Sequence, residues 1–85
     1  NRLDIRESEN GDKYYIFLDV IDTEQKIKIS TYNMLGKKVL DIYDGYYKDF
    51  NNAYEVPSTA LPNGLILCVV QGERFRLAEK FIVSR

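Results

Sequence analysis

The chain has 85 residues, of which 45% are apolar, and its 12 Lys and Arg against 13 Asp and Glu give a net charge of −1. This length allows one folded domain, and the near-zero charge excludes the broad positive field that would attract nucleic acid or anionic lipid. With no His and one Cys, the chain has no His general base, Cys/His zinc site or Ser/His/Asp triad, so we expect a binding or structural domain without cofactor rather than an enzyme.

The first half of the chain predicts strands separated by polar turns. Residues 26–30 alternate polar and apolar side chains, as a half-buried strand does, and the strand is expected to continue to Tyr32. Gly36 suits the positive φ that the following turn needs. We expect strands at residues 3–6, 14–21, 26–32 and 37–43, with turns at residues 9–12, 22–25 and 33–36.

The middle of the chain is less regular. Residues 44–52 predict a long loop with an irregular edge strand. Residues 54–56 predict a short strand that Pro57 ends, and the loop at residues 58–64 places Leu61 as an apolar plug under the sheet edge.

The last third of the chain predicts a hairpin. Residues 65–70 form an unbroken apolar run, typical of a central strand, in which Cys68 is expected to be a small buried side chain. Gly72-Glu73 predicts a type II′ turn. Residues 74–83 also offer one helical face through Phe75, Ala78 and Ile82. They fit a strand better, because apolar side chains recur at alternate positions with Glu79 as the exception: Phe75, Leu77, Phe81 and Val83.

Seven short strands with turn signals between them predict an all-β fold, an antiparallel β-sandwich in a single domain at residues 1–85. The lone thiol excludes an internal disulfide. The chain lacks an apolar run of the ~18 to 20 residues that a transmembrane helix needs, so we expect no transmembrane segment.

Three groups of side chains suggest binding chemistry, and each has a simpler structural interpretation. An acidic group at a strand end suits Ca²⁺, although it lacks the spacing of a calcium loop. An aromatic group mixed with Asp and Asn suits sugar rings, yet such rings commonly fill the core of small β domains. Four lysines suggest either a basic patch or protection of a sheet edge against aggregation. The three groups are Asp19, Asp22 and Glu24; Tyr43, Tyr46, Tyr47, Phe50 and Tyr54; and Lys26, Lys28, Lys37 and Lys38.

Three segments carry motifs of a known kind. Residues 28–40 read KISTYNMLGKKVL, residues 58–66 read STALPNGLI, and residues 79–83 read EKFIV. In this order they resemble the Ile-Tyr-Asn-x-x-Gly-x-x-Val hairpin, the Ser-x-Leu-x-x-Gly-x-Tyr segment and the Lys-Phe-Ile-Val terminal strand of the C-terminal sorting domains of type IX secretion in Bacteroidetes. Position 66 is Ile where the family commonly has Tyr.

The resemblance implies an Ig-like β-sandwich that forms the C-terminal fragment of a longer exported protein. It implies passage through the periplasm, recognition by an outer-membrane translocon, removal by a sortase-like peptidase, and delivery to the cell surface or medium. It also implies that Gly36 and Gly64 form turns and that the terminal recognition strand consists of Lys80, Phe81, Ile82 and Val83.

The terminal hairpin offers two modes of recognition, as a surface or by strand addition to its edge, and free edges also permit self-association. We therefore expect a non-enzymatic sorting signal. The alternative is an Ig-like adhesive or carbohydrate-binding module, which the aromatic group around Tyr46 and Tyr47 suggests.

Overall fold

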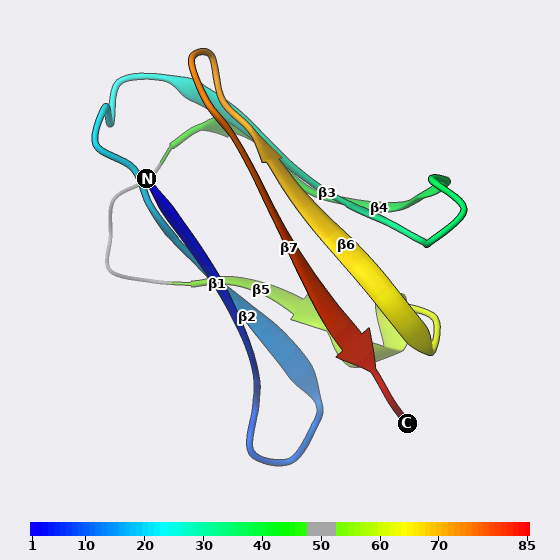
Figure 1. The fold of residues 1–85 in the computed structure, drawn as a ribbon. Helices are drawn as coiled ribbons and strands as arrows, with labels where there is room; N and C mark the ends of the chain where they lie inside the picture. Colours follow the sequence, from blue (N-terminus) through cyan, green and yellow to red (C-terminus); the bar gives the residue numbers. More distant parts are fainter. Residues whose placement is uncertain (48–52) are drawn as a thin grey trace.

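Seven strands and one 3-10 turn make up the fold in the computed structural model, which describes residues 1–47 and 53–85. Figure 1 shows their arrangement. In chain order they are β1 (Arg2–Glu7), β2 (Lys13–Asp19), β3 (Lys26–Tyr32), β4 (Lys38–Tyr46), β5 (Tyr54–Pro57), the 3-10 turn η1 (Ser58–Ala60), β6 (Gly64–Gln71) and β7 (Arg76–Val83).

The strands form two antiparallel sheets packed face to face. One sheet has the order β1-β2-β5 and the other has the order β4-β3-β6-β7. The chain makes hairpins within a sheet at β1–β2, β3–β4 and β6–β7, and it crosses between the sheets at the other connections. This confirms the predicted Ig-like β-sandwich, in which inward-facing residues of both sheets share one core.

Alternation along the strands builds the core. In β3, Ile27 and Ile29 face inward and are buried, while the lysines beside them are exposed. Across the sandwich, Ile16 of β2 is completely buried. Leu61 is 1% exposed and joins this cluster from the loop after η1, which confirms that it plugs the sheet edge. The core therefore draws on every second residue of the central strands, as the period of a strand requires.

The terminal hairpin has the arrangement that its composition predicted. β6 lies between β3 and β7, which explains why apolar side chains are tolerated on both of its faces. β7 is a strand, not a helix, and it pairs with β6 over its whole length, from Gln71 opposite Arg76 to Gly64 opposite Val83. Figure 1 shows the two strands side by side, with β7 at the edge of its sheet.

The prediction at residues 44–52 is a long loop with an irregular edge strand. At residues 44–46 the edge strand is confirmed and the loop is wrong, because β4, which lies at the edge of its sheet, continues to Tyr46. Asp44 and Gly45 suggested a loop, but Asp44 lies opposite Lys28 and Gly45 lies opposite Ile27 in the ladder. Pairing with a complementary neighbour thus overrides the low strand propensity of both residues. Residues 48–52 of the predicted loop lie outside the described residues.

The type II′ turn predicted at Gly72-Glu73 is also wrong. The N–H of Gly72 donates to the carbonyl of Phe75 at 2.9 Å, so Glu73 and Arg74 are the central residues of the turn. Gly72 does not have a positive φ. The last strand correspondingly begins at Arg76 rather than at residue 74.

Candidate functional site

The terminal strand β7 divides its last residues between the two faces of its sheet. Val83 is 1% exposed and belongs to the core. Phe81 is half-buried, and its ring centroid lies 5.0 Å from that of Tyr14 in the opposite sheet. Lys80 and Ile82 alternate with them, project outward and are exposed, Ile82 at 68%. Two of the four residues in the expected recognition strand are therefore available to a partner, and two hold the strand on the core.

The outward side chains of β7 continue into an apolar surface on β6. Ile82 lies opposite Leu65, Lys80 opposite Leu67, and Ala78 opposite Val69 in the ladder. Directly opposed residues of an antiparallel pair share a face. We call this surface the outer hairpin face, and it consists of Leu65, Leu67, Val69, Ala78, Lys80 and Ile82. Val69 on it is buried, Leu67 is half-buried and the others are exposed.

The backbone of β7 has a free edge. In an antiparallel pair, residues alternate between bonding their neighbour strand and directing their N–H and C=O groups away from it. The bond between Gly72 and Phe75 sets this alternation, so the groups of Arg76, Ala78, Lys80 and Ile82 point away from β6. Among the residues that the structure describes, β7 pairs with no strand other than β6.

One acceptor of this edge is already engaged. The hydroxyl of Tyr14 donates to the carbonyl of Ile82 at 3.3 Å. Burial raises the pKa of Tyr14, so this hydroxyl stays protonated and able to donate. The edge is therefore closed by a side chain at Ile82. From Arg76 to Lys80 no other described strand pairs with it, although β1 of the opposite sheet lies close to β7.

The outward side chains of β7 carry positive charge. Arg76 and Lys80 both project on the outer side, whereas Glu79 lies opposite Cys68 on the inner side. Arg76, Lys80 and Ile82 together form a stripe of cationic and apolar side chains along the edge of β7. Such a stripe can bind an extended segment that carries acidic and apolar side chains.

The two motif glycines lie where the chain changes direction. Gly36 is away from the outer hairpin face, and Gly64 is at its border. Gly36, in the turn after β3, has a φ of 82°, and a Cβ added there would meet nothing within 4 Å. Gly64, with a φ of 119°, begins β6 and lies opposite Val83. Both conformations favour glycine because they lie in the region that other residues rarely adopt.

The aromatic group that suggested a sugar site is mostly used for packing. The rings of Tyr43 and Tyr54 lie 4.8 Å apart and join the edges of the two sheets. Tyr47 is buried, and its hydroxyl donates to the carbonyl of Leu18 at 3.0 Å. Tyr46 is 63% exposed, and Lys26 lies 5.5 Å from its ring centroid. Phe50 lies outside the described residues. These contacts favour the core interpretation over a sugar platform.

The acidic group at the end of β2 does not converge. In residues 1–47 and 53–85 no three His, Cys, Asp or Glu side chains are placed to hold a metal ion. Asp22 instead accepts the backbone N–H of Glu24 at 3.2 Å and lies 3.7 Å from the guanidinium of Arg74. The group is a loop that faces solvent, as its simpler interpretation has it.

The four lysines do not protect one edge. Lys26 and Lys28 lie on β3, which is a central strand, so the edge-protection interpretation is wrong for them. Lys38, on the edge strand β4, forms an ion pair with Asp41 at 3.1 Å. Lys28 lies opposite Asp44. The negative charges of these acidic neighbours reduce the positive potential that the lysines would otherwise produce together as a basic patch.

Cys68 is completely buried on the inner face of β6. Burial, with a smaller contribution from the negative charge of Glu79, raises the pKa of its thiol to about 12. A thiol in this state is a packing residue and not a nucleophile.

Sequence reasoning located the terminal strand but missed most of the surface around it. The run at residues 65–70 is apolar throughout, so it does not reveal that Leu65, Leu67 and Val69 face outward while Ile66, Cys68 and Val70 face the core. The signal that distinguishes them is the pairing with β7, where Lys80 and Ile82 mark the outer face.

The comparisons with known proteins agree with the motifs. A family model described as "Secretion system C-terminal sorting domain" matches residues 10–84. No curated protein and no solved structure matches the chain. Among the described residues, the structure contains no helix with the length and apolar character needed to span a membrane.

Proposed function

The chain belongs to the family of secretion system C-terminal sorting domains, and we propose that the export machinery reads it through the outer hairpin face and the open edge of β7. Domains of this family are sorting signals for type IX secretion, and the proteins that carry them are exported to the cell surface or the extracellular space. The family is not catalytic.

The alternation along β7 is the observation that carries the proposal. Of the four residues in the expected recognition strand, Lys80 and Ile82 are exposed on one face, while Phe81 and Val83 are committed to the core. Recognition of the folded domain thus depends on Lys80 and Ile82, with Leu65 beside them. Phe81 and Val83 contribute by keeping the strand in place.

Strand addition is the mode that this geometry supports best. The N–H and C=O groups of Arg76, Ala78 and Lys80 point to the open edge, where an extended segment of the translocon would pair with them and supply main-chain affinity. The side chains of the outer hairpin face would add specificity. The same edge would allow two copies of the chain to associate, which is a competing use of the surface.

We propose that residues 1–85 form a single domain at the C-terminal end of a longer exported protein, that a sortase-like peptidase removes it after export, and that the domain itself is not an enzyme. The absence of His from the chain and the buried state of its single thiol support the last point.

Export of a fused reporter tests the assignment. A reporter protein placed before residue 1 is produced in a bacterium with a type IX system, and its surface and medium fractions are measured. We expect Ile82→Thr and Lys80→Glu to reduce export at least about tenfold, because either loses contacts at the centre of a recognised surface.

Two control variants make comparable changes elsewhere: one replaces an exposed apolar side chain by Thr, and the other reverses the charge of an exposed lysine. Phe17 is 41% exposed on the outer face of the other sheet, and Lys37 is exposed in the turn after β3. Phe17→Thr and Lys37→Glu should leave export within about twofold of the wild type, as surface changes away from the recognised face do. Equal export by Ile82→Thr, Lys80→Glu and both controls would show that the outer hairpin face is not what the machinery reads.

A further inference from the structure

Arg85 lies just after β7 and forms hydrogen bonds with the segment at residues 58–63. Its backbone N–H donates to the side-chain oxygen of Asn63 at 3.0 Å. Its guanidinium donates from Nη1 to the carbonyls of Ser58 and Leu61, two residues that are themselves buried. Beyond the ladder pair of Gly64 and Val83, Arg85 therefore joins the segment at residues 58–64 to the end of the terminal strand through both its backbone and its side chain.

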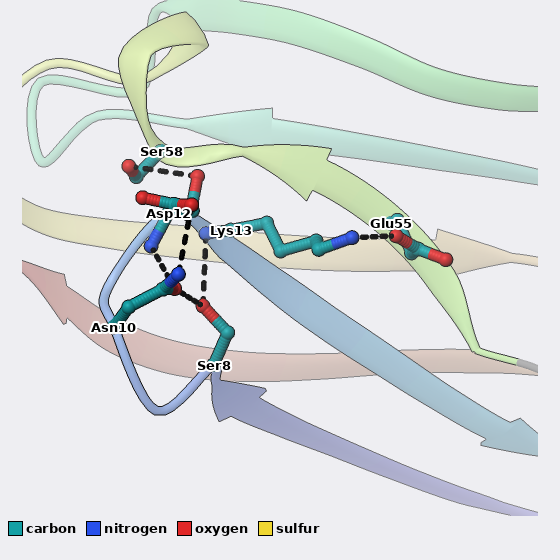
Figure 2. A network of polar contacts seen from close by, with 6 residues as sticks. All are labelled: Ser8, Asn10, Asp12, Lys13, Glu55 and Ser58. Carbon is teal, nitrogen blue, oxygen red and sulfur yellow. Dashed lines mark hydrogen bonds and ion pairs between the residues drawn. The ribbon is translucent and has the colours of Figure 1, made fainter.

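Ser58 continues this connection into the other sheet. Its N–H and its hydroxyl both donate to the carbonyl of Asp12, at 2.8 and 3.0 Å. Asp12 lies in the turn between β1 and β2, where its N–H and carboxylate both bond Asn10. Figure 2 shows Ser58 bonded to Asp12 in the β1–β2 turn, from which the contacts continue through Asn10, Ser8 and Lys13 to Glu55 of β5. A continuous set of hydrogen bonds thus runs from Arg85 through Ser58 to the opposite sheet.

We propose that Arg85 is a positioning residue for recognition, and that it holds the end of β7 so that Lys80 and Ile82 are presented at a fixed place. This proposal rests on the function proposed above. β7 is an edge strand whose last pair joins Gly64 and Val83, and strand ends with one neighbour open locally at low free-energy cost. Hydrogen bonds from a charged donor to buried carbonyls raise that cost.

The geometry favours arginine at this position. A guanidinium presents several N–H donors in a fixed plane, and here one nitrogen serves the carbonyls of Ser58 and Leu61. A lysine keeps the positive charge but offers a single ammonium on a flexible chain, so it restores the contact in part. An alanine keeps the backbone bond to Asn63 and loses both side-chain bonds.

Three variants separate positioning from other roles. Arg85→Ala removes the contact, Arg85→Lys retains the charge, and Arg74→Ala removes a matched positive charge from the exposed turn of the same hairpin. For each chain and the wild type, amide hydrogen exchange is measured at Phe81 and Val83, whose N–H groups bond β6, and export of the fused reporter is measured in parallel.

We expect Arg85→Ala to speed amide exchange at Phe81 and Val83 about tenfold or more and to reduce export. Arg85→Lys should lie between Arg85→Ala and the wild type in both measurements. Arg74→Ala should match the wild type in both. Faster exchange with unchanged export would overturn the proposal, because the contact would then have no part in recognition. Reduced export with unchanged exchange would also overturn it, since a partner would then contact Arg85 directly. Failure of the wild-type fusion to be exported would instead count against the proposed function, while the exchange data would still test the contact.

Discussion

The ring of Phe75 lies directly against Gly72 in the β6–β7 turn. A Cβ built on Gly72 would stand 2.1 Å from Cε1 of this ring and 2.7 Å from the side-chain oxygen of Gln25. Glycine is required here for close packing and not for its backbone freedom, because its φ is not positive. The hairpin that carries the outer hairpin face is thus held at its turn by an aromatic ring over a glycine.

This contact predicts that Gly72→Ala destabilises the chain by about 1 to 3 kcal/mol, the usual cost of forcing extra atoms into a packed site. Urea unfolding measures the change. In a Phe75→Ala background, where the ring is absent, Gly72→Ala should cost markedly less. Equal costs in both backgrounds would show that the ring does not set the requirement for glycine.

Gln25 is predicted to be a structural residue although it lies in a loop. It is 3% exposed, its Nε2 donates to the carbonyl of Asp22 at 2.7 Å, and its Oε1 accepts the N–H of Glu73 at 3.0 Å. Gln25→Leu keeps the volume but removes both bonds and leaves these backbone groups without their partner. We expect a loss of about 1 to 3 kcal/mol by urea unfolding. Gln71→Leu is the control: it also removes two hydrogen bonds to this turn, from Nε2 to the carbonyls of Gly72 and Phe75, but these groups are exposed and can bond water instead, so it should cost less.

The faces of β7 predict different effects for neighbouring residues. Val83→Thr places a hydroxyl in the core and should cost about 1 to 3 kcal/mol. Ile82→Thr changes an exposed side chain and keeps a β-branched residue, so the free energy of unfolding should stay within about 0.5 kcal/mol of the wild type. Thermal unfolding of both variants measures this. Equal destabilisation would contradict the assignment of Ile82 to the outer face and would also undermine its use in the export test.

The Cys68 thiol is predicted to be inert in the folded chain. Its complete burial and a pKa raised to about 12 leave little thiolate to react at pH 8. Reaction with a disulfide reagent such as Ellman's reagent should be at least about a hundredfold slower in buffer than in strong denaturant, because it requires opening of the fold. Similar rates in both conditions would show that the thiol is accessible.

Asp41 predicts a dependence of stability on pH. The Ser30 hydroxyl donates to this carboxylate at 2.7 Å, and this bond, with a second one from Lys38, lowers the pKa of Asp41. A carboxyl group with a lowered folded-state pKa stabilises the fold above its ordinary pKa of about 3.9, and the contribution is lost as pH falls through the lower value. Asp41→Asn should therefore lower the urea midpoint at pH 7, with the difference from the wild type shrinking toward pH 3. A difference that stays constant from pH 7 to pH 3 would contradict this.

Strand alternation and motif order were sufficient to predict much of this protein. The alternation of residues 26–30 predicted which face of β3 is buried, and the apolar run at residues 65–70 predicted a central strand, because both patterns depend on side chains alone. The motifs at residues 28–40, 58–66 and 79–83 predicted the sorting-domain family, which the family match confirms.

The errors occurred where a residue's role depends on its neighbour across the fold. Asp44 appeared to be a loop residue until its pairing with Lys28 placed it in β4. Gly72 appeared to supply a turn conformation, whereas the ring of Phe75 requires its lack of a side chain. Gln25 was predicted only as part of a turn at residues 22–25, yet it is buried and its side chain bonds Glu73 of the β6–β7 turn.

The sequence by itself thus determined the class of fold, the approximate positions of most strands along the chain and the family, because these follow from local periodicity and motif spacing. Only the tertiary structure decided which side of the terminal strand is offered to a partner and what secures its end. The contacts of Arg85 with Ser58 and Leu61 join residues 27 and 24 positions apart in the chain. Long-range contacts of this kind exist only after both sheets have packed, and no local pattern encodes them.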